Sequence, residues 1–542
     1  MNADKPDIQM PVNRSALIGT YLRLCFCFAV LILAGPRLAA GQQTIPPLPD
    51  STGWGVHVLS VARDPRGAIW VGTYGHGIYR LPAGATVWEP IRHDTSGSSI
   101  SWDFVQAIAF GARGQIWYGT IGNGWGLSTD GGATWKNWTY DQLGPEWQYV
   151  TPSGIAVRGD TTVIGTADGL QVTTNDGANW TAIGDAAGPR ARGPADTVFP
   201  VLRSEYVRRV AADRRGWNVA TLRGNQRLRR GPAGWQGEPL TAAAFPPANS
   251  LLIGKQLIRG TQCGLRPTND TLPCLRQGGP AAGAPKAPLT TWFRRPIALT
   301  DNSSIDQTYR YGSTMGGNFQ QHQGVEFNNP DGTPVLAIGS GTVVYAGPAE
   351  AGALTVSIRH DTPVSANGKR YRIFSTYYHN SALSVKVGRK VSKGTVIARV
   401  GNTGRATNDH LHLEVSASPS DSIALVVDSL QRFPPYTTNP ELWIEPLPGT
   451  GIVAGQVFDG SGAPVPQARV YGIIKRDPAD TPFSFAETYG DKAHSHPLYG
   501  EHFAVSDVPP GTYSVGTEIN GKKVFRQVTV EAGKLSWVVF KP

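Results

Sequence analysis

Five side chains between residues 322 and 414 are of the types that bind a metal ion and move protons. They are His322, Glu326, His379, His410 and His412, and they lie in a stretch of glycine-rich sequence. Zinc prefers imidazole nitrogen and carboxylate oxygen, and a catalytic zinc takes three protein ligands and leaves one position for water. The set therefore supplies enough ligands for a catalytic zinc, with two histidines to spare for proton transfer.

The segment DHLHLEV (409–415) has the alternation of a β-strand with one polar face. Residues two apart share a face, so His410, His412 and Glu414 are expected on the same side, with the histidines about 7 Å apart along the strand. A His-x-His pair alone is more often an ordinary polar strand face, so it is the whole ordered set that predicts a metal site. Glu414 either orients a histidine from behind or is an exposed strand carboxylate, and the sequence leaves both readings open.

The residues around these side chains predict a β-rich domain. The segment GTPVLAIGSGTVVYAG (332–347) has alternating apolar residues and two glycine turns, which predicts a tight β-hairpin. Residues 353–360 and 370–379 are expected to be further strands, and 386–404 another β segment interrupted by glycines. His360 lies on one of these strands outside the motif and is interpreted as structural.

Residues 309–417 resemble the lysostaphin/LytM-type zinc endopeptidases, bacterial enzymes that cut peptidoglycan peptides. The resemblance covers about a fifth of the chain. It rests on the His-x-x-x-acidic element at 322–326, the Gly-Thr-Pro-Val segment, Tyr-x-His at 377–379, Val-x-x-Gly at 391–394, GNTGRAT and His-x-His. It implies an antiparallel β-sheet peptidase domain, which we place at 297–448.

The resemblance also implies a role for each of the five side chains. His322, Glu326 and His412 match the ligands of Zn²⁺, and Glu326 stands where the family usually has aspartate. His379 and His410 match active-site histidines that do not bind the metal: one would act as general base towards the attacking water and the other would steady the developing oxyanion. The extra methylene of glutamate shifts its oxygens by about 1.5 Å, and we expect zinc ligation to survive this shift.

A repeat precedes this region. Similar units carry Thr73, Thr120, Thr166 and Thr221 at intervals of 47, 46 and 55 residues, close to the 40–50 residues of a propeller blade. The segment STDGGATW (128–135) resembles the Asp-box hairpin of sialidase-like propellers, whereas the second copy has Asn175 at the aspartate position. With a fifth unit near 250–265, these repeats predict a β-propeller of four to five blades over 42–278.

A propeller commonly serves as a rigid binding platform, and a protein or a glycan is the kind of ligand expected. A purely structural array is the alternative. His76, Trp102 and Trp125 either face a ligand or pack between blades, and the sequence favours neither.

Residues 1–41 are interpreted as a signal peptide or N-terminal anchor, because basic residues precede a short apolar run and small residues. Contact with a membrane is expected only through this segment, if it is uncleaved. The predicted location is therefore secreted or cell envelope. Cys263 and Cys274 remain in the mature chain, and a disulfide is favoured over two free thiols in an exported protein.

Residues 449–542 follow a linker-like stretch and resemble carboxypeptidase-regulatory-like, transthyretin-like modules, which implies a Greek-key β-sandwich that acts as a spacer. The segment 279–296 is expected to be a second linker. His494, His496 and His502 form either a metal patch or, as the favoured interpretation, part of a solvated loop.

The sequence as a whole predicts an all-β, multidomain, secreted zinc metalloendopeptidase that cleaves peptidoglycan or cell-wall peptides. The net charge of +10 comes without a long basic tract, so nucleic acid is not an expected partner. One alternative is a non-catalytic cell-wall or protein-binding module built on a peptidase-like domain. Another is a chain in which the propeller is the main functional unit.

Overall fold

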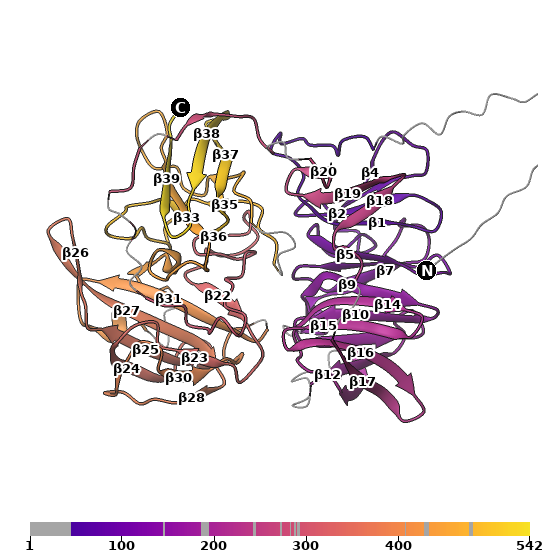
Figure 1. The fold of residues 1–542 in the computed structure, drawn as a ribbon, viewed down its shortest axis with the longest axis horizontal. Helices are drawn as coiled ribbons and strands as arrows, with labels where there is room; N and C mark the ends of the chain where they lie inside the picture. Colours follow the sequence, from indigo (N-terminus) through magenta and orange to yellow (C-terminus); the bar gives the residue numbers. More distant parts are fainter. Residues whose placement is uncertain are drawn as a thin grey trace, which may run out of the picture. The chain divides into compact units, whose positions relative to one another are not determined.

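Strands make up nearly all of the regular structure (Figure 1), so the predicted all-β class is confirmed. The computed structural model describes residues 45–542 except 145–146, 186–193, 242–244, 271–273, 282, 287–288, 290–292, 407, 428–432 and 476–480. The predicted signal segment lies outside the described residues. Within them, no helix has the length and apolar character needed to cross a membrane.

The repeat region folds into a succession of small sheets. The described strands form five sheets in chain order, in which each strand pairs with its neighbour in sequence, antiparallel except for β12 and β13. The sheets are β1–β4 (Val58–Arg63, Ile69–Thr73, Ile78–Leu81, Glu89–Ile91), β5–β8 (Val105–Phe110, Ile116–Thr120, Trp125–Ser128, Lys136–Trp138), β9–β13 (Val150–Arg158, Thr161–Thr166, Gly169–Thr173, Trp180–Gly184, Ala195–Pro200), β14–β17 (Val207–Asp213, Gly216–Thr221, Gly224–Gly231, Gly234–Leu240) and β18–β20 (Ser250–Ile253, Gln256–Thr261, Gly264–Pro267). A single turn of helix, α1 (Tyr140–Leu143), follows β8.

The repeated threonines have a common structural role. In each of the five sheets a threonine at the end of the second strand donates its hydroxyl to the carbonyl of a glycine that leads into the third strand, at 2.8–3.0 Å. The threonines are Thr73, Thr120, Thr166, Thr221 and Thr261. The hydroxyl therefore closes the same turn in every unit, which explains the sequence period and adds Thr261 to the series.

Two further contacts hold the repeat region together. Asn249, just before β18, donates from Nδ2 to the carbonyl of Val58 in β1 at 2.9 Å, so the last sheet contacts the first. Cys263 and Cys274 are joined by a disulfide, as predicted.

A second region contains the candidate metal ligands on an antiparallel sheet. Its strand order is β22-β31-β27-β25-β24-β29, and a smaller sheet has the order β23-β30-β28. The strands are β22 (Val325–Asn328), β23 (Pro334–Leu336), β24 (Gly341–Pro348), β25 (Leu354–His360), β26 (Val364–Ala366), β27 (Lys369–Asn380), β28 (Ala382–Leu383), β29 (Lys390–Val391), β30 (Val396–Arg399), β31 (His410–Ser418) and β32 (Thr437–Thr438). The apolar faces of β22, β25, β27 and β31 meet the residues of the smaller sheet in one buried core.

The predicted hairpin at 332–347 is wrong. Its two strands lie in different sheets: β23 pairs with β30 through Val335 and Ala398, whereas β24 pairs with β25. Both halves alternate as strands should, but β23 pairs with β30, about 60 residues further along the chain, whereas β24 pairs with the next strand, β25. Local alternation identified the strands correctly and their pairing incorrectly, because pairing depends on which apolar faces reach the shared core.

The C-terminal residues form three small sheets. The strands are β33 (Gly451–Val457), β34 (Arg469–Val470), β35 (Ala486–Glu487), β36 (Phe503–Val508), β37 (Gly511–Ile519), β38 (Lys522–Val530) and β39 (Leu535–Phe540). Their orders are β36-β33-β39, β21-β38-β37 and β34-β35. β21 (Gly279–Pro280) belongs to the segment predicted as a linker, and it pairs in parallel with β38.

A buried ion pair and a buried charge-assisted hydrogen bond connect this C-terminal region to the region that contains the candidate ligands. Arg295 and Asp507 are in contact at 2.6 Å with side chains only 3% and 4% exposed. Glu441, on the 3-10 turn Pro440–Leu442, accepts bonds from the guanidinium of Arg310 and, at 2.6 Å, from the backbone N–H of Ser506. Each charge is compensated inside the protein, so the two regions depend on each other.

Replacing Asp507 with Ala should strongly destabilise the protein, because it leaves the buried Arg295 charge without its carboxylate. Removal of one partner of a buried pair costs about 3–5 kcal/mol. Urea-induced unfolding of the full chain measures the effect. The matched control is Glu531→Ala, which breaks the exposed Lys534–Glu531 pair and should cost about 0–1 kcal/mol. Equal losses in the two variants would contradict the structural role of the buried pair.

Candidate metal centre

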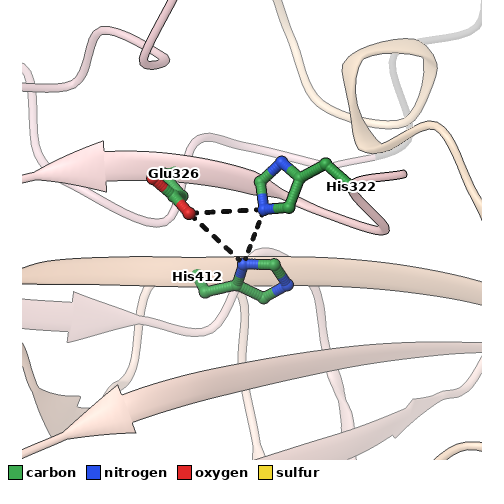
Figure 2. A group of neighbouring side chains, drawn as sticks. All are labelled: His322, Glu326 and His412. Carbon is green, nitrogen blue, oxygen red and sulfur yellow. Dashed lines mark hydrogen bonds and ion pairs between the residues drawn. The ribbon is translucent and has the colours of Figure 1, made fainter. Parts of the chain in front are cut away.

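Three of the predicted side chains converge on one point. Figure 2 shows His322, Glu326 and His412 directed toward one another. His322 Nε2 lies 3.2 Å from His412 Nδ1 and 3.3 Å from Glu326 Oε1. The Glu326 oxygen lies 3.9 Å from His412 Nδ1. Each of the three residues offers one ligand atom, and these atoms all lie within 4.8 Å of one another. Among the described residues, this is the group of three that could hold a metal ion.

The spacing of these atoms fits a tetrahedral zinc ion. Bonds of about 2.0–2.2 Å at tetrahedral angles place neighbouring ligand atoms about 3.3–3.6 Å apart. The three observed separations bracket this range, and the donor set is two imidazole nitrogens and one carboxylate oxygen. The residues present are therefore suited to zinc in both chemistry and spacing.

Strand register places two of the ligands side by side. Glu326 on β22 is the direct partner of His412 on β31, and Tyr378 on β27 is the partner of His412 on the other side. Directly opposed side chains in an antiparallel pair lie about 4.5–5.5 Å apart at Cβ. This distance lets the carboxylate and the imidazole meet at one ion.

His322 lies just before β22 and is held by its own contacts. Its backbone N–H donates to Ser313 O at 3.0 Å, and its carbonyl accepts from the N–H of Gly312 at 2.8 Å. The imidazole stacks on Tyr309, with ring centroids 4.1 Å apart and planes 14° apart. The third ligand is thus positioned by a loop rather than by the sheet.

Gly324 permits the close approach of His322 and His412. A Cβ at this position would lie 2.5 Å from His412 Nε2 and 2.6 Å from the carbonyl oxygen of Leu413. No side chain fits there without displacing His412, so the glycine of the motif is a steric requirement of the site.

His379 and His410 flank the three ligand candidates with matching orientations. His379 Nδ1 lies 2.9 Å from Thr403 O, and His410 Nδ1 lies 2.8 Å from Asn408 O. A carbonyl only accepts, so each Nδ1 is the protonated nitrogen and each Nε2 has a free lone pair in the neutral ring. The two rings lie 4.8 Å apart, and His410 Nε2 is 3.7 Å from Glu326 Oε1.

The backbone and the protonation state of His379 are both unusual. Its φ of 65° falls in the left-handed region, which non-glycine residues rarely occupy outside constrained sites. Burial, with the neighbouring charges of His410 and His412, holds its pKa well below the ordinary value. His379 is therefore a neutral imidazole at neutral pH.

Glu414 lies behind His412 and is buried, with 5% of its surface exposed. The alternative of an exposed carboxylate is therefore wrong. Its Oε1 is 3.4 Å from His412 Nε2, the ring nitrogen opposite the one that faces His322. Burial disfavours the charged His412 ring, but bonds to the carboxylates of Glu326 and Glu414 outweigh it and raise the His412 pKa to about 9.

The charge of Glu326 is also stabilised by its surroundings. Burial opposes the ionised carboxylate, yet His410 and the bonds from His322 and His412 hold its pKa well below the ordinary value. Glu326 is therefore an anion at neutral pH, the form in which a carboxylate binds a metal.

The other histidines singled out from the sequence lie elsewhere. His360 is buried, with bonds at Nε2 to Ser375 and at Nδ1 to the carbonyl of Ser340, in agreement with a structural role. His494, His496 and His502 have separate partners. His494 contacts Thr437 O, His502 contacts the backbone of Val457, and His496 is fully buried against Trp443, so the solvated-loop interpretation is wrong for His496.

A cavity of about 930 Å³ opens onto the metal centre. Its walls include His322, Glu326, His379, His410 and His412, together with side chains of the repeat region. Of the repeat-region aromatics named from the sequence, Trp102 lines this cavity, whereas Trp125 is fully buried.

Sequence reasoning missed Tyr309 and Tyr378. Tyr309 stacks on His322, and the hydroxyl of Tyr378 bonds to Glu414. The signal for Tyr378 was its place as the middle residue of the Tyr-x-His motif at 377–379. Tyr309 has no recognisable spacing to the ligands, because a loop brings it to the site.

The segment that contains the site is similar in sequence to known proteins. Residues 320–422 match the sequence model of Peptidase family M23. The chain is 40% identical over 99 residues to an uncharacterized metalloprotease of Haemophilus influenzae, a match covering 18% of this chain and 19% of that protein. It is 40% identical over 94 residues to peptidoglycan DD-endopeptidase ShyA of Vibrio cholerae, covering 17% and 20%.

A further relative is DD-carboxypeptidase/endopeptidase Mpg of Neisseria meningitidis, 35% identical over 108 residues, covering 20% of this chain and 23% of the relative. Among solved structures, the catalytic domain of the antimicrobial peptidase lysostaphin from Staphylococcus simulans is 29% identical and covers 25% of this chain and 86% of its own, with a TM-score of 0.18. The chain spans about a fifth of the length of the curated relatives it matches. The predicted LytM-type peptidase domain is confirmed by the match of residues 320–422 to Peptidase family M23.

Glu326→Asp should keep stoichiometric zinc, whereas Glu326→Gln should lose zinc affinity sharply because a neutral amide replaces the anionic oxygen. The zinc affinity of Glu326→Gln should fall by more than about tenfold, because replacing a residue that only hydrogen-bonds to a metal ligand already costs at least that much. Zinc affinity of the full chain is measured by competition with a chromophoric chelator. If the Gln variant binds zinc as tightly as the wild type, position 326 is not a ligand.

Glu414→Gln should weaken zinc binding by about 10–100-fold, because a partner that orients a ligating histidine acts through its second nitrogen. The same chelator competition measures this, and Glu414→Asp should recover part of the affinity. The control is Glu89→Gln, which alters the exposed Arg80–Glu89 pair far from the site and should leave zinc affinity unchanged. An unaltered affinity in Glu414→Gln would show that the carboxylate does not position His412.

Proposed function

We propose that this chain is a zinc-dependent endopeptidase that hydrolyses peptide bonds in peptidoglycan stem or cross-bridge peptides. The observation that carries the proposal is the convergence of His322, Glu326 and His412 at zinc-ligand spacing, with His379 and His410 beside them. A bare metal-storage site would not need two further histidines with free Nε2 lone pairs.

The proposed chemistry divides between the metal and the protein. When bound to His322, Glu326 and His412, zinc supplies a Lewis acid that polarises the scissile carbonyl. His379 and His410 each keep Nδ1–H on a backbone carbonyl and present Nε2 to the reacting groups. The neutral ring that takes a proton at Nε2 from the attacking water serves as general base and can pass that proton to the leaving amine. The other ring would enter the reaction with a second proton, taken from solvent at Nε2, and would donate it as a hydrogen bond to the developing oxyanion.

Backbone carbonyls position the imidazole rings of His379 and His410. Because each Nδ1 is tied to a carbonyl in the chain, the ring cannot change tautomer without losing that bond. The positive φ of His379 keeps its ring turned toward His410 at the end of β27. The strain at this residue is the type that surrounding structure sustains at functional sites.

The named relatives support peptidoglycan as the substrate. ShyA is a peptidoglycan DD-endopeptidase and Mpg a DD-carboxypeptidase/endopeptidase, and they resemble this chain over 94 and 108 residues. The large cavity beside the metal centre has room for a branched peptide substrate.

The proposal extends to the domain organisation. The five sheets of the repeat region are proposed to form a five-bladed propeller within 42–278, consistent with the contact between β1 and the residues before β18. Residues 297–448 are the proposed peptidase domain and 449–542 a transthyretin-like β-sandwich. A signal at 1–41 would place the chain outside the cytoplasm, in the cell envelope or secreted, where peptidoglycan is found.

The full chain should bind one zinc and release peptides from purified peptidoglycan, with activity lost on chelation and recovered on adding zinc. His379→Ala and His410→Ala should each keep the zinc and lose about 10²–10⁴-fold in turnover, the range for a general acid–base group. Mass analysis of the products from defined muropeptides identifies the bond cut.

Three outcomes would count against this proposal. Stoichiometric zinc with no cleavage of several wall types would favour the alternative, a non-catalytic binding module. Absence of stoichiometric zinc would remove the metal centre itself. Loss of metal in the His379 or His410 variants would show that the ligand assignment is wrong.

A further inference from the structure

A row of aromatic rings leads away from the metal centre. Tyr309 stacks on His322 at 4.1 Å, Phe319 lies 5.6 Å from Tyr309, and Trp102 lies 6.1 Å from Phe319. All these residues line the same cavity. The aromatic row, defined as Tyr309, Phe319 and Trp102, is therefore a continuous wall that starts at a candidate zinc ligand and ends in the repeat region.

The far end of the row is held rigidly. Trp102 lies in the loop between β4 and β5, and its ring packs over Gly122, where a Cβ would lie 3.3 Å from the indole. The next residue, Asp103, accepts bonds through its carbonyl from the N–H groups of Gly75 and Gly77 at 3.1 and 2.8 Å. Ser101, on the other side, bonds through Oγ to the carbonyl of Asn123. The indole is thus placed before any ligand arrives.

One member of the row, Phe319, and a neighbouring aromatic residue of the same cavity, Tyr140, expose much of their apolar surface to water. Phe319 is 47% exposed, and Tyr140, which lines the same cavity, is 45% exposed. In the part of the chain that the structure describes, these are the aromatic side chains among the large exposed apolar residues. Exposed apolar groups gathered in one cavity mark a binding surface more often than scattered ones do.

The row carries no formal charge, which restricts what it can bind. The ring planes of the row are inclined to one another, by 57° between Tyr309 and Phe319 and by 70° between Phe319 and Trp102. Peptidoglycan stem peptides consist of small residues and of residues with charged carboxylates or amines, and none of these presents a ring-sized apolar face to such a surface. The sugar rings of the glycan strand do, because the C–H faces of a pyranose pack on the electron-rich face of an aromatic ring. These sugars are also covalently attached to the peptide that the metal centre would cut.

We propose that the aromatic row is a binding surface for the sugar rings of the glycan strand, so that the enzyme prefers peptides still attached to their sugars. This inference rests on the proposed function, since it assumes that peptidoglycan enters the cavity. It gives the repeat region a direct part in substrate selection through Trp102. Phe319 and Tyr309 then connect the sugar subsite with the metal centre.

The test compares two cross-linked peptide substrates that differ only in the presence of the attached disaccharides. The full chain should have a higher kcat/KM for the sugar-bearing substrate. In Trp102→Ala and Phe319→Ala, the ratio of kcat/KM between the two substrates should fall about tenfold, consistent with loss of one aromatic packing contact. Leu299→Ala is the control, because Leu299 is 63% exposed and does not line the cavity, and its ratio should match the wild type.

A second measurement is independent of catalysis. Peptide-free glycan strands should quench or shift the tryptophan fluorescence of the full chain when they bind. Trp102→Ala and Phe319→Ala should each weaken the affinity for these strands. Phe319→Ala still contains Trp102, so its binding can be followed by the same fluorescence change. If neither peptide substrate is cut but glycan strands bind through the row, the proposed function fails, and with it the substrate preference, whereas the assignment of the row as a sugar-binding surface stands. If both substrates are cut with a ratio that Trp102→Ala and Phe319→Ala leave unaltered, this inference is overturned and the proposed function stands.

Discussion

The pairing of β22 with β31 is the constraint on which the site depends. In that register Glu326 faces His412, and the apolar side chains between them point into the core. A shift of one residue would turn the imidazole and the carboxylate to opposite faces, because side chains alternate along a strand. Burial of Phe327 and Leu411 on the core side resists such a shift, so the core that stabilises the sheet also sets the distance between two candidate ligands.

Burial gives the site its electrostatic character. In a poorly solvated site each charge needs a partner of opposite charge or a hydrogen bond. The hydrogen-bond partners of each histidine ring also decide which of its two nitrogens is protonated. Glu326 keeps its negative charge because three imidazoles surround it, and Glu414 supports His412 from behind. Thr403 and Asn408 contribute only backbone carbonyls, yet these carbonyls select the tautomers of His379 and His410. The arrangement thus combines a metal-binding group of two histidines and a glutamate with two further histidines that can accept protons.

Two local patterns, His-x-x-x-Glu and His-x-His on a strand, were sufficient to single out four of the five chemical side chains, whereas His379 and the role of each residue depended on the resemblance to a known family. Local patterns were not sufficient for the hairpin at 332–347, whose strands join different sheets. His496 illustrates the same limit: its neighbours suggest a solvated loop, but packing on Trp443 buries it. Tyr309 and Trp102 reach the cavity from loops, and the position of a loop in the fold cannot be predicted from the periodicity of the sequence.

The sequence by itself determined the all-β class, the repeat, the disulfide and the identity of the side chains available for chemistry, because composition, alternation and short motifs act over neighbouring residues. Tertiary structure alone decided that Glu414 is buried behind His412, that Gly324 leaves room for two imidazoles, and that Trp102 shares a cavity with the metal centre. These facts depend on contacts between residues far apart in the chain, which form only when the apolar faces of different strands are buried together.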